Sequence, residues 1–65
     1  MISYAPLFKT LEEKGLVISS LREHGIHPTT IAQINNDVSI KLEKLDKICT
    51  ILQVPIEKVV EITFK

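Results

Sequence analysis

Four polar side chains able to hydrogen-bond with another molecule gather in one stretch of this 65-residue chain: Thr29, Thr30, Gln33 and Asn36. The amide groups of glutamine and asparagine donate and accept hydrogen bonds at once, which matches the edge of an adenine base. A threonine methyl group can lie against the methyl group of thymine. In a helix, successive residues turn by about 100°, so Thr29, Gln33 and Asn36 share one side. These side-chain types suit contacts with base edges by Thr29, Thr30 and Gln33, and a plain solvated helix face, which would look equally polar, is the alternative.

The other reactive residue types do not combine into a catalytic or metal site. His24 and His27 are three residues apart, but zinc needs further ligands, and no cysteine or carboxylate is suitably spaced beside them. The single cysteine, Cys49, lies on an apolar helical stripe with no histidine close in sequence, which favours a buried, inert thiol. A catalytic triad and a glycine-rich phosphate loop are both absent from the sequence. We therefore expect no catalysis, no metal and no cofactor.

The polar face requires a helix over about residues 28–35, and turn signals flank this segment. Gly25 can adopt a positive φ and end a short preceding helix over residues 18–24. Pro28 suits the first turn of the next helix, and Asn35-Asn36-Asp37 is a turn. A helix, a glycine-centred turn and a second helix form a helix-turn-helix, which often places its second helix in the DNA major groove.

Three more helices are predicted from the apolar spacing. The first spans about residues 4–14, with Ser3 as N-cap, a stop at Gly15, and an apolar stripe of Tyr4, Leu7, Phe8 and Leu11. The fourth spans residues 40–52, with Ser39 as N-cap and a stripe of Leu42, Leu45, Ile48, Cys49 and Leu52. A short fifth helix follows Pro55 over about residues 56–60. The expected fold is all-α, with five short helices.

The end of the chain changes from a helical period to a period of two. Ile62 and Phe64 share one side of residues 61–65, which predicts a short strand. Its expected partner is the segment 1–3, within the chain or across a dimer, because a lone strand leaves its backbone unpaired. The terminal apolar residues either complete the core or form a homodimer interface, and we favour the dimer: Ile2, Val60, Ile62 and Phe64.

Composition limits the class of protein. Residues 1–65 fit a single domain near the lower size limit for folding without disulfides or metals, and an apolar fraction of 45% favours a packed core. Neither a membrane span nor a secretory signal is present, so we expect a cytoplasmic protein with no membrane or small-molecule partner. Eight basic and eight acidic residues balance to zero net charge, which argues against strong non-specific attraction to a polyanion.

A set of apolar residues and glycines recurs with a recognisable spacing along nearly the whole chain: Leu7…Leu11…Lys14-Gly15-Leu16, Leu21…Gly25-Ile26, Thr30-Ile31…Ile34 and Leu42…Leu45…Ile48-Cys49…Leu52…Val54…Ile56…Val59. This pattern resembles the Cro/C1-type helix-turn-helix family of phage repressors and small bacterial regulators. The resemblance is closest to a compact bacterial and phage subgroup, whose members often share the Ile-x-Tyr start and the Leu-x-x-x-Gly-Ile turn.

The resemblance implies a lambda-repressor-like helix-turn-helix domain that binds double-stranded DNA, works as a homodimer and regulates transcription, most simply as a repressor. The recognition helix would be residues 28–35. Phosphate contacts are implied at the ends of helices and in nearby loops, where this sequence has His27, Asn36, Ser39 and Lys41. His27 also occupies the position that caps the recognition helix. No arginine lies on that helix to read guanine, so base reading should lean towards A·T pairs and DNA shape.

Three positions differ from the choices that are common in this family. Ile18 stands where a polar, phosphate-contacting residue is frequent, His27 stands at the usual Ser/Thr cap, and Asp37 stands where glycine or a basic residue is frequent. Together with the neutral charge, Ile18 and Asp37 motivate a second hypothesis. It is a protein-interaction module on a helix-turn-helix scaffold, such as an antirepressor or a regulator's partner, with little or no DNA binding.

Overall fold

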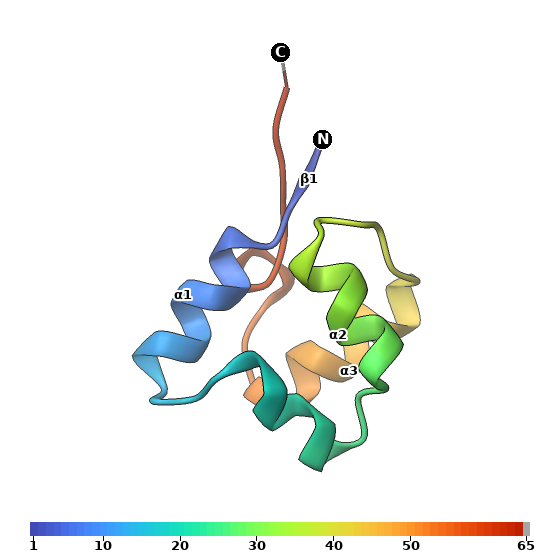
Figure 1. Ribbon diagram of the computed structural model, residues 1–65. Helices are drawn as coiled ribbons and strands as arrows, with labels where there is room; N and C mark the ends of the chain where they lie inside the picture. The colour runs from blue at the N-terminus through green and yellow to red at the C-terminus, as the bar shows by residue number, and fades with distance from the viewer. Residues whose placement is uncertain (65) are drawn as a thin grey trace.

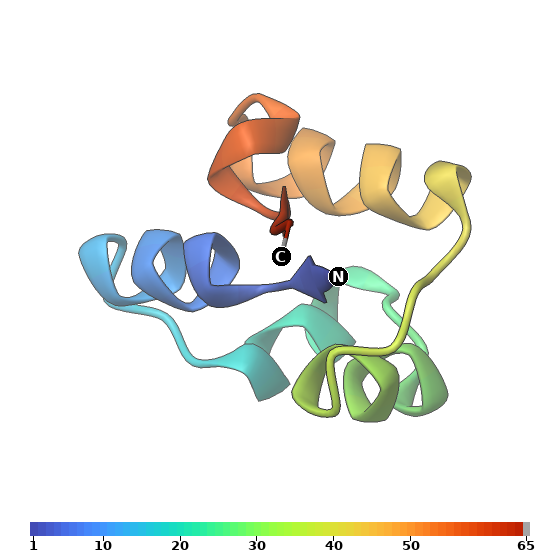
Figure 2. The same ribbon diagram turned by 90° about the horizontal axis from the view of Figure 1, so that it is seen from above.

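The computed structural model describes residues 1–64, in which short helices surround one apolar core and the two ends of the chain pair (Figure 1). The elements in chain order are β1 (Ile2–Ser3), α1 (Ala5–Glu13), the 3-10 helix η1 (Ile18–His24), α2 (Pro28–Asn35), α3 (Leu42–Leu52), the 3-10 turn η2 (Ile56–Lys58) and β2 (Glu61–Ile62). α2 packs on η1, while α1 and α3 both contact η2. In the view from above, α2 and α3 lie on opposite sides of the paired termini (Figure 2).

Every helix longer than one turn in the described part of the chain ends in the same way. The first or second residue after each helix has a positive φ: Gly15, Gly25, Asp37 and Gln53. The next N–H then returns to a carbonyl five residues earlier, as in Leu16 to Leu11, Ile26 to Leu21, Val38 to Gln33 and Val54 to Cys49, at 2.8–3.1 Å. This is the Schellman arrangement, which gives the last carbonyls of a helix a hydrogen-bond partner. The sequence predicts helix ends at all four places, but it predicts a positive φ only at Gly25 and not at the non-glycine residues Asp37 and Gln53.

The core is built from apolar residues that the helical spacing turns inwards, and it draws on α1, η1, α2 and α3 and on residues that adjoin the helices and η2. Its buried side chains are Tyr4, Leu7, Leu11, Leu21, Ile26, Ile31, Ile34, Ile48, Leu52 and Val59. α1 is tied to the end of the chain by two hydrogen bonds as well. The Leu7 N–H donates to the Val59 carbonyl at 3.1 Å, and the Thr10 hydroxyl donates to the Lys58 carbonyl at 2.6 Å.

The predicted terminal strand is confirmed, and its partner belongs to the same chain. β1 and β2 run antiparallel, with Ile2 opposite Ile62 and Ser3 opposite Glu61. The pairing extends one step outwards, because the N–H of Thr63 donates to the carbonyl of Met1 at 2.8 Å. The pair projects from the helical body as a stalk (Figure 1).

Four helices occur in residues 1–64 rather than the predicted five, because η2 is a single three-residue 3-10 turn. The fourth predicted helix also begins later than expected. Lys41, not Ser39, is the N-cap of α3, and no side chain caps that end. Leu42 consequently lies on the first turn, 72% exposed, rather than in the core. At α1 the N-cap is Tyr4, although the Ser3 hydroxyl accepts the N–H of Ala5 at 3.2 Å. No helix among the described residues has the length and apolar character needed to cross a membrane.

Candidate nucleic-acid interface

α2 has the predicted bounds and turns an uncharged face outwards. Ile31 and Ile34 are buried, whereas Thr29 is exposed and Gln33 is half-buried. In the view from above, α2 lies at one side of the molecule and α3 at the opposite side (Figure 2). The helix therefore presents short polar side chains to solvent, where another molecule can reach them.

Thr30 does not belong to this open face. Its side chain is only 6% exposed and packs beside Ile31 on the inner side of α2. A residue in that position cannot reach a base edge without leaving the core, so the expected base contact by Thr30 does not fit the structure. The hydroxyl-bearing residue that faces outwards is Thr29.

Two residues of the outward face were missed at the sequence level. Ala32 and Asn35 are both exposed. At 100° per residue, Ala32 falls near the middle of the exposed arc, between Asn35 and Thr29. The helical geometry carries this signal, but alanine has no polar group, and the turn signal Asn35-Asn36-Asp37 overlaps the end of the predicted helix. A methyl group at the centre of the face can contact a thymine methyl group, and the Asn35 amide can pair with adenine.

Two roles are predicted for His27, the cap of the recognition helix and a phosphate contact, and the structure confirms the cap. Its Nδ1 accepts the N–H of Thr29 at 3.1 Å, and its backbone is extended, as at a normal N-cap. Because Nδ1 is the acceptor, the ring proton of the neutral side chain lies on Nε2. The imidazole is exposed, so Nε2–H is free to donate to an anion beside the positive end of the helix dipole.

Asn36 closes the other end of α2. One hydrogen of its side-chain amide is donated to the Ala32 carbonyl at 2.8 Å. The side chain is exposed, so its second amide hydrogen faces solvent. Asn36 is therefore held in one orientation and retains one donor for a phosphate.

The loop from α2 to α3 carries the remaining predicted phosphate contacts. Ser39 and Lys41 are both exposed. Lys41 is the N-cap of α3, and its carbonyl accepts the N–H of Lys44 at 2.9 Å. The backbone of Lys41 is therefore held in place, and only its side chain has to be oriented towards a phosphate. The free N–H groups at the start of α3 add a partial positive charge beside it.

Lys47 is an exposed residue of α3 that braces the turn of the helix-turn-helix. Its ammonium group donates to the carbonyl of Gly25 at 3.0 Å, which ties α3 to the residue that ends η1. This hydrogen bond stabilises the turn between η1 and α2. Arg22, on η1, is exposed.

The segment after α2 is held by Tyr4, whose side chain is 1% exposed. The Tyr4 hydroxyl donates to the Val38 carbonyl at 2.7 Å, and the Tyr4 N–H donates to the Asp37 carboxylate at 3.1 Å. Burial raises the pKa of the Tyr4 hydroxyl, and the negative charge of Asp37 adds to that rise. Asp37 thus has a hydrogen-bonding role within the fold.

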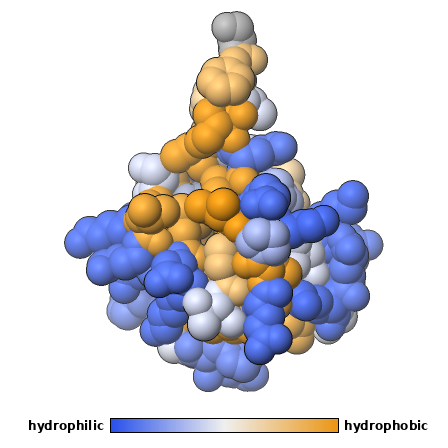
Figure 3. All heavy atoms as spheres, turned by 180° about the vertical axis from the view of Figure 1, so that it is seen from behind, coloured by the Kyte–Doolittle hydropathy of each residue, from blue (hydrophilic) through white to orange (hydrophobic). Residues whose placement is uncertain are grey.

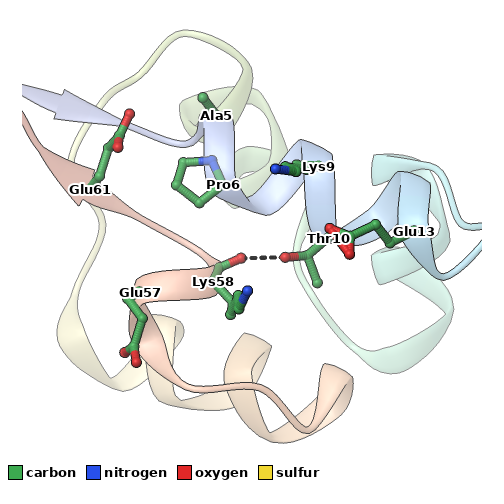
Figure 4. Close-up of a pocket in the computed structure, with 8 residues that line it drawn as sticks. All are labelled: Ala5, Pro6, Lys9, Thr10, Glu13, Glu57, Lys58 and Glu61. Atoms are coloured by element: carbon green, nitrogen blue, oxygen red, sulfur yellow. Dashed lines mark hydrogen bonds between the residues drawn. The ribbon is translucent and has the colours of Figure 1, made fainter.

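A hollow lies away from α2, between α1, η2 and β2 (Figure 4). It measures about 360 Å³ and is lined by Ala5, Pro6, Lys9, Thr10, Glu13, Glu57, Lys58 and Glu61. Three carboxylates against two ammonium groups make it an unfavourable place for a phosphate. Within residues 1–64, no group of three or more histidine, cysteine, aspartate or glutamate residues is arranged to hold a metal. Burial raises the pKa of the Cys49 thiol, with Asp46 adding to the effect, so its nucleophilic thiolate is disfavoured.

The sequence and the structure of this chain are similar to those of known proteins. A model of the family described as "Cro/C1-type HTH DNA-binding domain" matches residues 7–65. Among solved structures, the crystal structure of transcriptional regulator VanUg, Form II, is similar, with a TM-score of 0.91 and 26% sequence identity over 98% of this chain and 87% of that chain. Among curated proteins, no sequence matches significantly.

Proposed function

Since the chain belongs to the family of Cro/C1-type helix-turn-helix DNA-binding domains, we propose that it represses transcription by placing α2 in the major groove of an operator. The observation that carries this proposal is the outward face of α2. It is open, it is uncharged, and it bears only side chains short enough to approach base edges closely. A bound copy would block a promoter that overlaps the operator, without any chemical step.

Base reading falls to the outward residues of α2. Thr29 and Gln33 keep the role expected from the sequence, and Ala32 and Asn35 join them because they share the exposed arc. Gln33 and Asn35 supply donor–acceptor pairs for adenine, while the methyl groups of Thr29 and Ala32 supply apolar contacts for thymine. We therefore expect an operator half-site rich in A·T pairs where α2 enters.

Backbone contacts come from groups around the two ends of α2. His27 would donate from Nε2 near the start of the helix, and Asn36 would donate its second amide hydrogen near the end. Ser39 and Lys41 lie beyond Asn36 and face solvent. Such contacts fix the position of the helix on the duplex and carry no sequence information by themselves.

The decisive experiment selects sites from a random double-stranded DNA pool and then measures the affinity of point variants for the selected site. Gln33→Ala should weaken specific binding by about 1–3 kcal/mol and relax the preference at a single base pair. Thr50→Ala is a matched control, because Thr50 is exposed on α3 and its hydroxyl bonds within that helix. Absence of any selected sequence, or equal binding of all sequences by the wild type, would favour the protein-interaction module instead.

Lys41→Met tests the backbone contact separately from base reading. We expect weaker binding to every sequence by a similar factor. The slope of log affinity against log salt should become shallower by about one unit per copy, because one phosphate is no longer neutralised. An unchanged salt slope would remove Lys41 from the contact set.

We further propose that the protein binds as a homodimer through the stalk. Ile2 and Val60 are half-buried against the chain's own core, so they contribute less to a second interface than expected. Ile62 and Phe64 are exposed, Phe64 by 89%. Apolar side chains gather on the stalk and continue into the body on the face behind α2 (Figure 3). The two-stranded sheet also has unpaired outer edges, which a second copy can extend.

Sedimentation over a range of concentrations tests the dimer. Phe64→Ser should shift the protein towards monomer and reduce affinity for a two-half-site operator much more than for a single half-site. Leu42→Ser is the matched control, because Leu42 is also strongly exposed but lies on α3, away from the stalk. A wild-type protein that stays monomeric on DNA, or an equal effect of both substitutions, would contradict a stalk interface.

A further inference from the structure

Tyr4 joins two parts of the molecule that are far apart in the sequence. It follows β1 directly, and its two hydrogen bonds reach residues 33 and 34 positions further along the chain. Its backbone N–H binds the Asp37 carboxylate at 3.1 Å, and its hydroxyl binds the Val38 carbonyl at 2.7 Å. We call this pair of bonds the Tyr4 clasp.

The clasp holds the point where α2 ends. Asp37 has a φ of +54° and is the left-handed residue of the Schellman ending, in which Val38 donates to the Gln33 carbonyl at 2.8 Å. Glycine is the usual residue at such a position because a side chain is strained there. Here the strained side chain is itself the acceptor for the Tyr4 N–H. The direction in which the chain leaves α2 is therefore set by a residue of the N-terminal segment.

That direction determines where the loop residues lie relative to DNA. Only two residues separate Val38 from Lys41, and Lys41 starts α3. At the other end, Tyr4 follows β1, whose partner strand carries the exposed Ile62 of the stalk. The clasp consequently lies between the proposed dimer element and the proposed phosphate contacts.

We infer that Tyr4 is a positioning residue for DNA binding: by fixing Asp37 and Val38 it holds Lys41 where it can contact a phosphate, and it links the stalk to the recognition helix. This inference rests on the proposed function. It assigns to a buried tyrosine that touches no DNA a share of the affinity for DNA.

The main test uses Tyr4→Phe, which keeps the buried ring and the backbone bond to Asp37 and removes only the hydroxyl. Binding to the selected operator should weaken about 3- to 10-fold, and the salt slope should become shallower by about one unit per copy, as one phosphate contact is lost. Lys41→Met should then have little further effect in the Tyr4→Phe background. All measurements are made at a temperature where circular dichroism shows each variant fully folded.

Thr10→Val is the matched control. It removes another hydroxyl that is buried and donates to a backbone carbonyl, at 2.6 Å, but this bond joins α1 to η2 and lies away from the loop after α2. Thr10→Val should destabilise the fold by a similar amount and leave operator affinity and salt slope unchanged. If both variants weaken DNA binding alike, Tyr4 acts only through general stability and the inference is wrong.

Asp37 supplies a second test that does not require Tyr4 to be changed. Asp37→Ala should reproduce the loss of affinity, and Asp37→Asn should restore it, because asparagine keeps a side-chain oxygen for the Tyr4 N–H and tolerates a positive φ. A wild type that selects no operator refutes the proposed function and this inference together. If the wild type selects an operator and Tyr4→Phe binds it as tightly and with the same salt slope, the inference alone is refuted.

Discussion

Substitution of Gly25 by alanine is the most direct test of the turn that joins η1 to α2. Gly25 has a φ of +92°, and a left-handed conformation costs a residue with a Cβ about 1–2 kcal/mol. A Cβ at this position would also lie 3.0 Å from Nζ of Lys47, so the lysine would have to move away from the carbonyl that it binds. That exposed bond contributes about 0.5 kcal/mol. The expected loss for Gly25→Ala is therefore about 1.5–2.5 kcal/mol.

Gly15→Ala provides the matched control. Gly15 also has a positive φ, +70°, and also ends a helix, but a Cβ there would meet no atom within 4 Å. This variant should lose only the strain of about 1–2 kcal/mol. Urea denaturation measures both losses. In thermal unfolding, each kcal/mol corresponds to a fall in melting temperature of about 4–8 °C for a domain of this size.

The contribution of Lys47 is isolated by repeating Gly25→Ala in a Lys47→Met background. Without the ammonium group, the cost of Gly25→Ala should fall towards that of Gly15→Ala. Equal costs of Gly25→Ala in the two backgrounds would show that Lys47 does not stabilise the turn. A cost of Gly25→Ala below about 0.5 kcal/mol in the wild type would refute the left-handed conformation itself.

Three further predictions concern stability. The pKa of Tyr4 is higher in the folded than in the unfolded protein, where it is about 10. The stability that depends on the neutral hydroxyl is therefore fully present below about pH 10 and is lost as pH rises through the folded-state pKa, so stability should fall less steeply at alkaline pH in Tyr4→Phe. Leu42→Ala should change the free energy of unfolding by less than about 0.5 kcal/mol, whereas Ile48→Ala, at a fully buried position of the same helix, should cost about 2–5 kcal/mol in urea denaturation. Gln53→Gly should stabilise the protein by about 0.5–1 kcal/mol because glycine relieves the strain of a φ of +55°. Asp37→Gly should stabilise it less, because this change also removes the acceptor of the Tyr4 N–H. Equal gains would contradict a stabilising role for the clasp.

Local patterns were sufficient for much of the fold. Pro28 and the turn signal at residues 35–37 gave the bounds of α2, and the spacing of Ile31 and Ile34 gave its inner side. The change of period at the end of the chain gave β2 and its partner. Apart from the pairing of β1 with β2, which joins the two ends of the chain, these features depend on residues within about one helical turn of each other, which is the range over which sequence periodicity is informative.

The errors have physical causes as well. The hydroxyl of Thr30 favours a base contact, but a threonine is small enough to be buried, and the position of Thr30 on the inner side of α2 decides its environment. Leu42 was assigned to the core because α3 was started too early, at a Ser39 cap that does not form. The clasp by Tyr4 and the brace by Lys47 join residues 34 and 22 positions apart, and no local pattern reports contacts of that range.

The structure also explains the three residues that depart from the family pattern. Ile18 packs against the core, His27 caps α2 through Nδ1, and Asp37 accepts the Tyr4 N–H. Each has a role in the fold, so these departures no longer favour a module that has lost DNA binding. The remaining observation in favour of the protein-interaction module is the zero net charge.

Zero net charge has a measurable consequence that does not require DNA binding to be lost. If each copy of a dimer neutralises phosphates with Lys41 alone, or with Lys41 and the exposed Arg22, two to four cations are involved. The slope of log affinity against log salt is then about −2 to −4, and affinity falls about 10- to 150-fold between 50 and 200 mM salt. Titration of the selected operator with salt measures this slope. A slope near −10 would require many more cations than this surface offers and would contradict the interface built around α2. A slope in the expected range would mean that base contacts from an uncharged helix carry most of the discrimination.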